Sequence, residues 1–179
     1  EANSIITDPS FNGPSALQLQ SGSPAFAAGT PIAGITTDIT GTSRSVTNPS
    51  MGAYELTGDF VPPTISYTTL SNTLCTSDRS LSVTITDNSG VNTTTGTKPR
   101  LYFKKSTDNN TYSGNTSADN GWKYVEASNA ASPFNFATDY SLLQSAVAAG
   151  DIIQYFITAQ DLSTSVLVGI NNGTFNSTP

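Results

Sequence analysis

The residues best suited to bind a ligand are basic and gather around one short stretch of the chain. The sequence has 7 Lys and Arg residues against 13 Asp and Glu, so a local excess of basic residues is informative. A strand presents alternate residues on one face, which places Lys98, Arg100, Tyr102 and Lys104 together. With the nearby Lys123, these residues form a predicted glycan-binding face. Such a face could bind an acidic glycan, with Tyr102 or Trp122 stacked on a sugar ring. The alternative is a solvated outer face whose lysines protect an edge strand from pairing.

Three turns rich in side-chain oxygen are candidate cation sites. They begin at Asp87, Asp108 and Asp119, and each Asp is followed by Asn. Carboxylate and amide oxygens are ligands of Ca²⁺, although none of these turns has the ligand spacing of an EF-hand loop. The alternative is a turn in which the Asp side chain accepts a hydrogen bond from its own backbone two residues on. We therefore expect no cofactor, with calcium at these turns as the alternative.

The composition excludes most catalytic chemistry. The chain has no histidine, which removes Ser-His-Asp and Cys-His nucleophiles and most zinc sites. It has no phosphate-binding glycine motif. Asp151 and Asp161 lie at opposite ends of one predicted strand, roughly 33 Å apart at the rise of a β-strand, which is too far for a glycosidase pair. We therefore expect that the chain is not an enzyme.

Charge and cysteine content restrict the partners. The net charge of −6 disfavours nucleic acid and anionic membranes as partners, and no apolar run is long enough to insert into a membrane. The single cysteine, Cys75, is predicted to be a small buried apolar residue. Because the chain starts at Glu1 rather than Met, we expect it to be a piece of a longer protein.

The elements that must position these residues are β-strands. The strongest strand is predicted at 150–161, where β-branched and aromatic residues alternate and Tyr155 faces a buried core. A short helical turn is expected at 141–149, just before it. The other predicted strands are 64–70, 81–86, 100–104, 122–127, 134–140, and a last strand or hairpin at 166–168 and 174–175. Seven short strands separated by turn residues predict an all-β fold, an immunoglobulin-like or fibronectin type III-like sandwich.

Residues 1–57 carry a first resemblance. The segments are Leu17 to Gly29, with the sequence LQLQSGSPAFAAG, then Asp38 to Arg44, DITGTSR, and Met51 to Glu55, MGAYE. Their order and spacing resemble the terminal coils of secreted right-handed parallel β-helix proteins. The resemblance implies a β-helix cap segment at 1–57, although Phe26 and Ala27 replace the family's Ile-Asp pair. Catalytic carboxylates of such lyases and hydrolases lie on middle coils, so a structural role is expected here.

Residues 60–179 carry a second resemblance. Pro62 to Ile65, Asp87 to Val91, Pro99 to Lys104 and Gly150 to Asp161 resemble immunoglobulin-like modules near the C-terminal ends of large secreted bacterial surface proteins. With the proline-containing linker at 58–63, the expected domains are the cap segment at 1–57 and a sandwich at 64–179. The resemblance implies a noncatalytic module that is secreted or lies on the cell surface. Its expected role is to act as a spacer, to mediate adhesion, or to associate with a polysaccharide or cell-surface glycan. Its other expected partners are upstream domains of the same chain. The alternative is the accessory C-terminal region of a polysaccharide-degrading enzyme whose active site lies upstream.

Overall fold

The chain is an all-β protein divided into two compact units. The computed structural model describes residues 5–164 and 166–171. The first unit is Glu1–Phe60 and the second is Val61–Pro179, so the division falls inside the proline-containing linker expected at 58–63. In the part that is described, no helix has the length and apolar character needed to cross a membrane.

The first unit consists of one small hairpin and a series of turns. Strands β1 (Phe11–Gly13) and β2 (Ala16–Leu19) pair antiparallel, and a further antiparallel bridge joins Thr37 to Ser43. Few apolar side chains are buried among its described residues, and Ile6 and Ile39 are largely exposed. This unit is therefore held together mainly by polar contacts.

Asp38 is the centre of a polar network in this unit. Its Oδ1 accepts hydrogen bonds from the backbone N–H groups of Thr40 (2.7 Å) and Thr42 (2.9 Å), and its Oδ2 accepts one from the N–H of Glu55 (2.9 Å). The hydrogen bond from Glu55, followed by those from Thr40 and Thr42, holds the pKa of Asp38 well below its usual range. One carboxylate thus fixes a tight turn and ties it to a segment 17 residues later.

Arg44 and Glu55 form the second polar contact between these segments. Their side chains lie 3.3 Å apart and are largely buried, and Arg44 also donates to the carbonyl groups of Ser50 and Gly52. The Glu55 carboxylate accepts the N–H of Ser50 at 3.0 Å. The residues that carry the first resemblance therefore hold one another in place.

We predict that Asp38→Asn loosens the first unit. In the intact chain, the amide hydrogens of Thr40, Thr42 and Glu55 should exchange faster than in wild type, because a neutral side chain accepts weaker hydrogen bonds. Asp8→Asn is the matched control, since Asp8 accepts a single exposed backbone hydrogen bond from Ser10. Unchanged protection of all three amides in Asp38→Asn would contradict the proposed role of this network.

The same network predicts acid sensitivity. Because the pKa of Asp38 is lowered in the folded unit, its contribution to stability is fully present above its unfolded pKa of about 3.9 and is lost as the pH falls further, towards the folded pKa. The difference in exchange protection between wild type and Asp38→Asn should therefore shrink on acidification below about pH 4. If the difference in exchange protection between wild type and Asp38→Asn grew on acidification, the expected direction of this pH dependence would be wrong.

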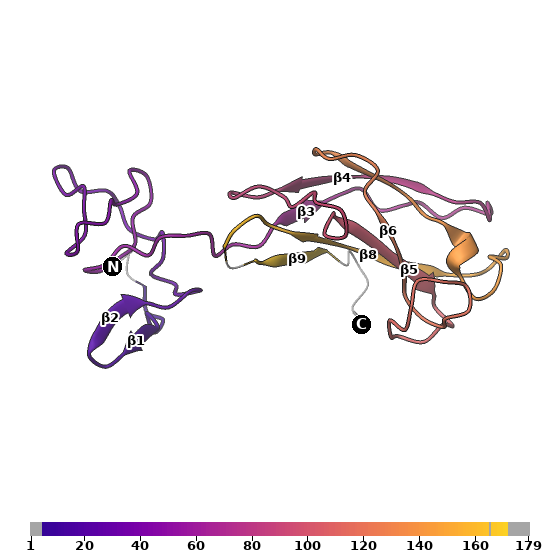
Figure 1. Ribbon diagram of the computed structural model, residues 1–179, viewed down its shortest axis with the longest axis horizontal. Helices are drawn as coiled ribbons and strands as arrows, with labels where there is room; N and C mark the ends of the chain where they lie inside the picture. The colour runs from indigo at the N-terminus through magenta and orange to yellow at the C-terminus, as the bar shows by residue number, and fades with distance from the viewer. Residues whose placement is uncertain (1–4, 165, 172–179) are drawn as a thin grey trace. The chain divides into compact units, whose positions relative to one another are not determined.

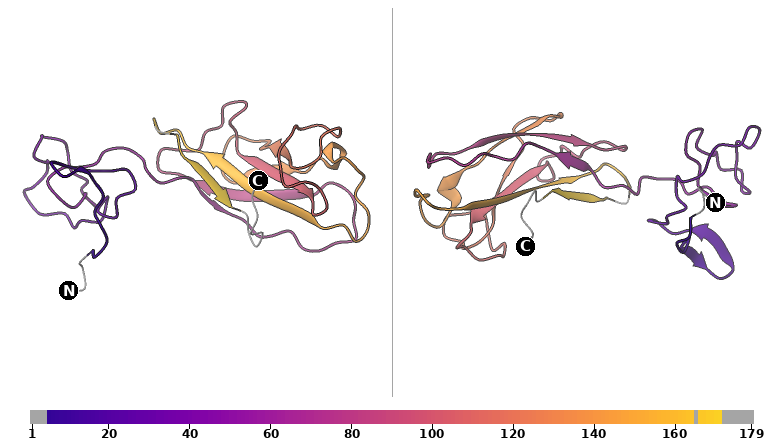
Figure 2. Two further views of the ribbon diagram at one scale, coloured as in Figure 1. Left: turned by 90° about the horizontal axis from the view of Figure 1, so that it is seen from below. Right: turned by 180° about the vertical axis from the view of Figure 1, so that it is seen from behind.

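The second unit has the arrangement of a β-sandwich. One sheet has the order β3-β4-β7 and the other the order β6-β5-β8-β9, and every neighbouring pair is antiparallel. Figure 1 shows β3 and β4 in one layer and β5, β8 and β9 in the other, and Figure 2 shows the layers from two further sides. The strands are β3 (Thr64–Ser66), β4 (Ser80–Thr86), β5 (Arg100–Lys105), β6 (Lys123–Glu126), β7 (Phe134–Ala137), β8 (Ile153–Gln160) and β9 (Val168–Asn171).

The core lies between these sheets and follows the expected alternation. Strand β4 shows it most clearly, since Leu81, Val83 and Ile85 are buried and the residues between them are exposed. The other buried residues of the cluster include Leu101, Phe103, Phe134, Phe136, Ile157 and Ala159. Tyr155 packs against this cluster, and its hydroxyl oxygen accepts the N–H of Leu70 at 2.8 Å.

Some local expectations need correction. Strands β3 and β7 end earlier than predicted, and the helical turn is a 3₁₀ helix, η1, at Tyr140–Leu142. Cys75 is exposed rather than buried, because it lies in the connection between β3 and β4 instead of in a strand. The strand residues expected at 174–175 lie outside the described part of the chain.

Candidate functional site

Aromatic side chains lie close together on the outer face of the four-stranded sheet. They come from β5, β6, β8 and the connection between β5 and β6. In β5, Leu101 and Phe103 belong to the core, so the alternate residue Tyr102 faces the other side of the sheet. The register places Tyr102 opposite Tyr124 of β6 and opposite Phe156 of β8. A row of three aromatic rings therefore crosses the sheet at one level.

The rings of this row are in direct contact with a fourth ring. Tyr102 stacks on Phe156 with centroids 4.9 Å apart and nearly parallel planes, and it lies 5.5 Å from Tyr124. Tyr112, from the connection between β5 and β6, meets Tyr102 edge-on at 6.4 Å and lies 6.1 Å from Tyr124. Tyr112 is 50% exposed, while Tyr102 and Tyr124 are half-buried. We call Tyr102, Tyr112 and Tyr124 the aromatic patch.

Tyr112 is electrically neutral at physiological pH. Burial, and then the neighbouring Tyr124 and Tyr102, raise the pKa of Tyr112 above its ordinary value. Its hydroxyl group is therefore protonated, and it can both donate and accept a hydrogen bond.

Arg100 supports this patch and does not add a free charge to it. Its guanidinium lies 4.2 Å from the centre of the Tyr124 ring, in cation–π contact. The same group is 3.2 Å from the Glu126 carboxylate and donates to the carbonyl of Gly96 at 2.6 Å. Because its charge is balanced by Glu126, Arg100 orients Tyr124 rather than offering an anion site.

Lys104 and Lys123, predicted on an exposed cationic face, are instead buried. They are 3% and 1% exposed, because the connection at 106–122 folds back over them. Lys104 Nζ donates to the carbonyl groups of Lys105 (3.1 Å) and Asp108 (3.0 Å). Lys123 Nζ donates to those of Gly114 (3.0 Å) and Asp119 (2.7 Å). These two ammonium groups fasten the connection, and of the predicted face Lys98, Arg100 and Tyr102 keep partial exposure.

Trp122 is buried beneath the same connection. It is fully inaccessible and packs edge-on against Phe156 at 4.8 Å, on the outer side of the sheet rather than in the core between the sheets. Its Nε1 donates to Asn110 Oδ1 at 2.8 Å, and Lys104 Nζ lies 5.5 Å from its ring. It is therefore not available to stack on a sugar, whereas Tyr112 is. Sequence reasoning missed Tyr112 because it lies in a polar connection without strand periodicity.

The oxygen-rich turns at Asp108 and Asp119 are occupied by the protein's own groups. Asp119 Oδ2 accepts the N–H and the hydroxyl of Thr116 (3.1 and 2.7 Å), which lowers the pKa of Asp119. Asp108 Oδ2 accepts the N–H of Lys105 at 3.1 Å. Among the residues described, neither belongs to a group of three or more side chains that could hold a metal ion.

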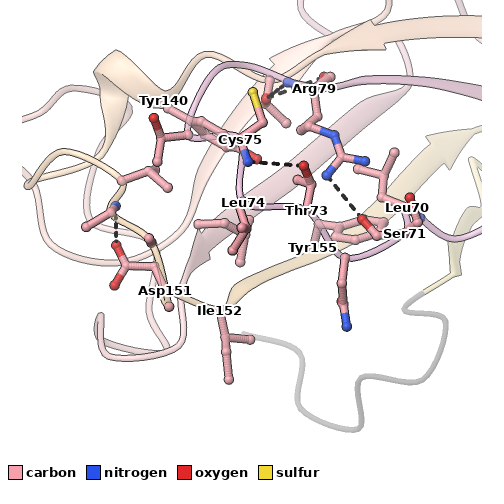
Figure 3. A pocket seen from close by; sticks show the side chains of 18 of the residues that line it. Leu70, Ser71, Thr73, Leu74, Cys75, Arg79, Tyr140, Asp151, Ile152 and Tyr155 are labelled. Carbon is pink, nitrogen blue, oxygen red and sulfur yellow. Dashed lines mark hydrogen bonds between the residues drawn. The ribbon is translucent and has the colours of Figure 1, made fainter.

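A cavity of about 340 Å³ opens between two connections of the second unit. Figure 3 shows Cys75, Arg79, Tyr140 and Tyr155 among the residues around it. Hydrogen bonds with Ser77, assisted by the charge of Arg79, lower the pKa of the Cys75 thiol. The chain has no histidine to act as a base, so this cavity lacks the partner of a Cys-His nucleophile. No sequence motif marks it, since its lining comes from irregular connections.

Comparisons with protein-family models, curated proteins and solved structures found no match to this chain.

We predict that Lys104→Met destabilises the second unit by about 1.5–3 kcal/mol, because two carbonyl groups lose a charged donor in a buried place. Urea unfolding followed by the fluorescence of Trp122 measures this change, since Trp122 packs beside Lys104. Lys98→Met is the matched control and should change the free energy of unfolding by no more than about 0.5 kcal/mol, as a partly exposed lysine. Equal effects of the two substitutions would contradict the fastening role of Lys104.

Proposed function

We propose that this chain is a noncatalytic module of a secreted, multidomain bacterial surface protein, and that its aromatic patch holds a neutral polysaccharide. The proposal combines the sequence resemblances with the geometry of the second unit. The observation that carries it is the patch itself: three tyrosine rings in mutual contact, one of them half-exposed, with their nearest cation balanced by a carboxylate.

The strand order supports an immunoglobulin-like or fibronectin type III-like identity for the second unit. Three strands in the order β3-β4-β7 face four strands in the order β6-β5-β8-β9, as in a sandwich whose seven consecutive strands are divided between two antiparallel sheets. For the first unit, the mutual contacts of Asp38, Arg44 and Glu55 support the view that the β-helix-like motifs act as a structural cap.

The character of the patch favours a neutral sugar over an acidic one. Sugar rings present apolar C–H faces that pack on aromatic rings, and their hydroxyl groups pair with tyrosine hydroxyls. An acidic glycan would need a free cation, whereas Arg100 is paired with Glu126 and Lys104 and Lys123 are buried. The net charge of −6 also disfavours polyanions.

We predict that the intact chain is retarded in native gels that contain a soluble neutral polysaccharide such as a β-glucan, a xylan or a galactomannan. Tyr112→Ala should weaken the binding about tenfold, which corresponds to about 1.4 kcal/mol of stacking. The matched control is Tyr54→Ala, which removes a partly buried tyrosine from the first unit and should bind as wild type does.

Two results would overturn this function. One is the absence of retardation by every neutral polysaccharide tested. The other is retardation only by an acidic polymer such as polygalacturonate, since this would move the site away from the aromatic patch.

A further inference from the structure

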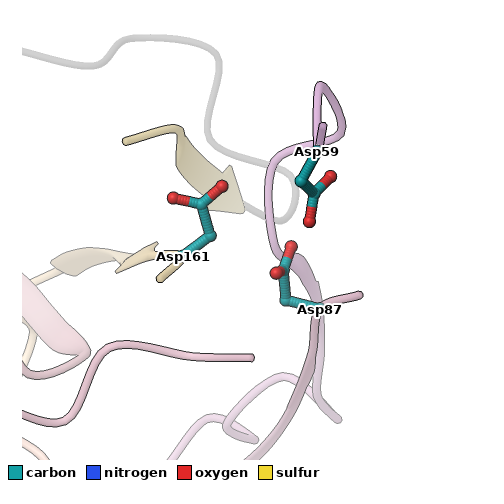
Figure 4. Close-up of side chains that lie close together, drawn as sticks. All are labelled: Asp59, Asp87 and Asp161. Atoms are coloured by element: carbon teal, nitrogen blue, oxygen red, sulfur yellow. The ribbon is translucent and has the colours of Figure 1, made fainter. Parts of the chain in front are cut away.

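Two acidic residues meet at one end of the sandwich of the second unit. Asp87 directly follows β4, and Asp161 directly follows β8. An antiparallel bridge joins Val91 to Asp161, and the N–H of Leu162 donates to the carbonyl of Gly90 at 3.0 Å. The turn that starts at Asp87 is thus fastened to the end of β8, which brings carboxylate oxygens of Asp87 and Asp161 within 4.8 Å of one another (Figure 4).

Asp161 is buried with one of its oxygens unsatisfied. The residue is 0% exposed, and its Oδ1 accepts the N–H of Leu167 at 2.8 Å. Its Oδ2 is buried and has no hydrogen-bond partner among the described residues. Nor does any described Lys or Arg form an ion pair with it. A buried carboxylate in this condition is costly unless a cation or a donor compensates it.

The separation of the two carboxylates suits one hard cation between them. Calcium binds oxygens at about 2.3–2.6 Å, so two oxygens on one ion can be up to about 5.2 Å apart, whereas magnesium at about 2.0–2.1 Å allows only about 4.2 Å. Asp87 Oδ1 already accepts the N–H of Ser89 at 2.9 Å, which fixes the orientation of its carboxylate. Calcium also tolerates irregular ligand sets completed by carbonyl groups and water.

We propose that Asp87 and Asp161 bind a calcium ion that fastens the turn after β4 to the end of β8. The ion supplies the positive charge that Asp161 Oδ2 lacks. Asp59, also drawn in Figure 4, belongs to the first unit and is not one of the two proposed ligands. This site is an addition to the proposed polysaccharide binding. The two proposals are tested independently, because they use different residues.

The test is calcium binding by the intact chain. After treatment with EDTA and dialysis, calorimetric titration with CaCl₂ should give one saturable site, with a dissociation constant of about 10⁻⁴ to 10⁻³ M as in weak calcium modules. Calcium at 10-fold that concentration should raise the melting temperature, while magnesium at the same concentration and ionic strength should raise it less.

Two variants locate the site. Asp161→Asn and Asp87→Asn keep the shape of each side chain and should abolish the thermal response to calcium, and each should raise the melting temperature of the calcium-free chain by removing one of two neighbouring negative charges. Asp119→Asn is the matched control and should keep the full response, because its carboxylate caps a separate turn.

The proposal is overturned if the wild-type chain shows neither calorimetric binding nor a calcium-dependent melting temperature. It is also overturned if Asp87→Asn and Asp161→Asn respond to calcium as wild type does, or if magnesium stabilises the chain as much as calcium. Direct calorimetry on wild type decides the question even if a variant fails to fold.

Discussion

The pairing of β5 with β8 is the constraint on which the second unit depends. Its register runs over six residue pairs, from Arg100 opposite Thr158 to Lys105 opposite Ile153. Because side chains alternate, this register sends Leu101 and Ile157 into the core and Tyr102 and Phe156 to the outer face. A shift by one residue would exchange the two faces, so the core and the aromatic patch are specified together.

On the outer face of the four-stranded sheet, two of the few lysines of this protein bind backbone carbonyl groups instead of lying in water. A solvated sheet face would leave the lysines in water, but here the connection between β5 and β6 supplies carbonyl groups that receive Lys104 and Lys123. Each ammonium group donates to two backbone carbonyls. The connection is thereby ordered without an apolar core of its own, and its ordered path is what brings Tyr112 beside Tyr102 and Tyr124.

Periodicity predicts a strand well where alternate residues are buried in the core, as in β4. Leu81, Val83 and Ile85 are the simplest case, and the all-β architecture follows from several such runs. The position of Lys104 could not be predicted in the same way, because a period of two assigns a side chain to a face and does not reveal whether a distant connection covers that face. For the same reason the sequence offered Trp122 as a residue that could stack on a sugar, although the connection buries it. Tyr112, in a polar run without a period, carried no signal at all.

Three buried charges of this chain are compensated by backbone groups, and Asp161 differs from them. Asp38 is compensated by backbone N–H groups, and Lys104 and Lys123 by backbone carbonyls. In each case the polar groups of nearby turns replace water and stabilise the charge that burial would disfavour. Asp161 receives one such donor for two oxygens and has the carboxylate of Asp87 nearby. One backbone donor does not balance the buried Asp161 carboxylate, and a divalent cation is the simplest group that would.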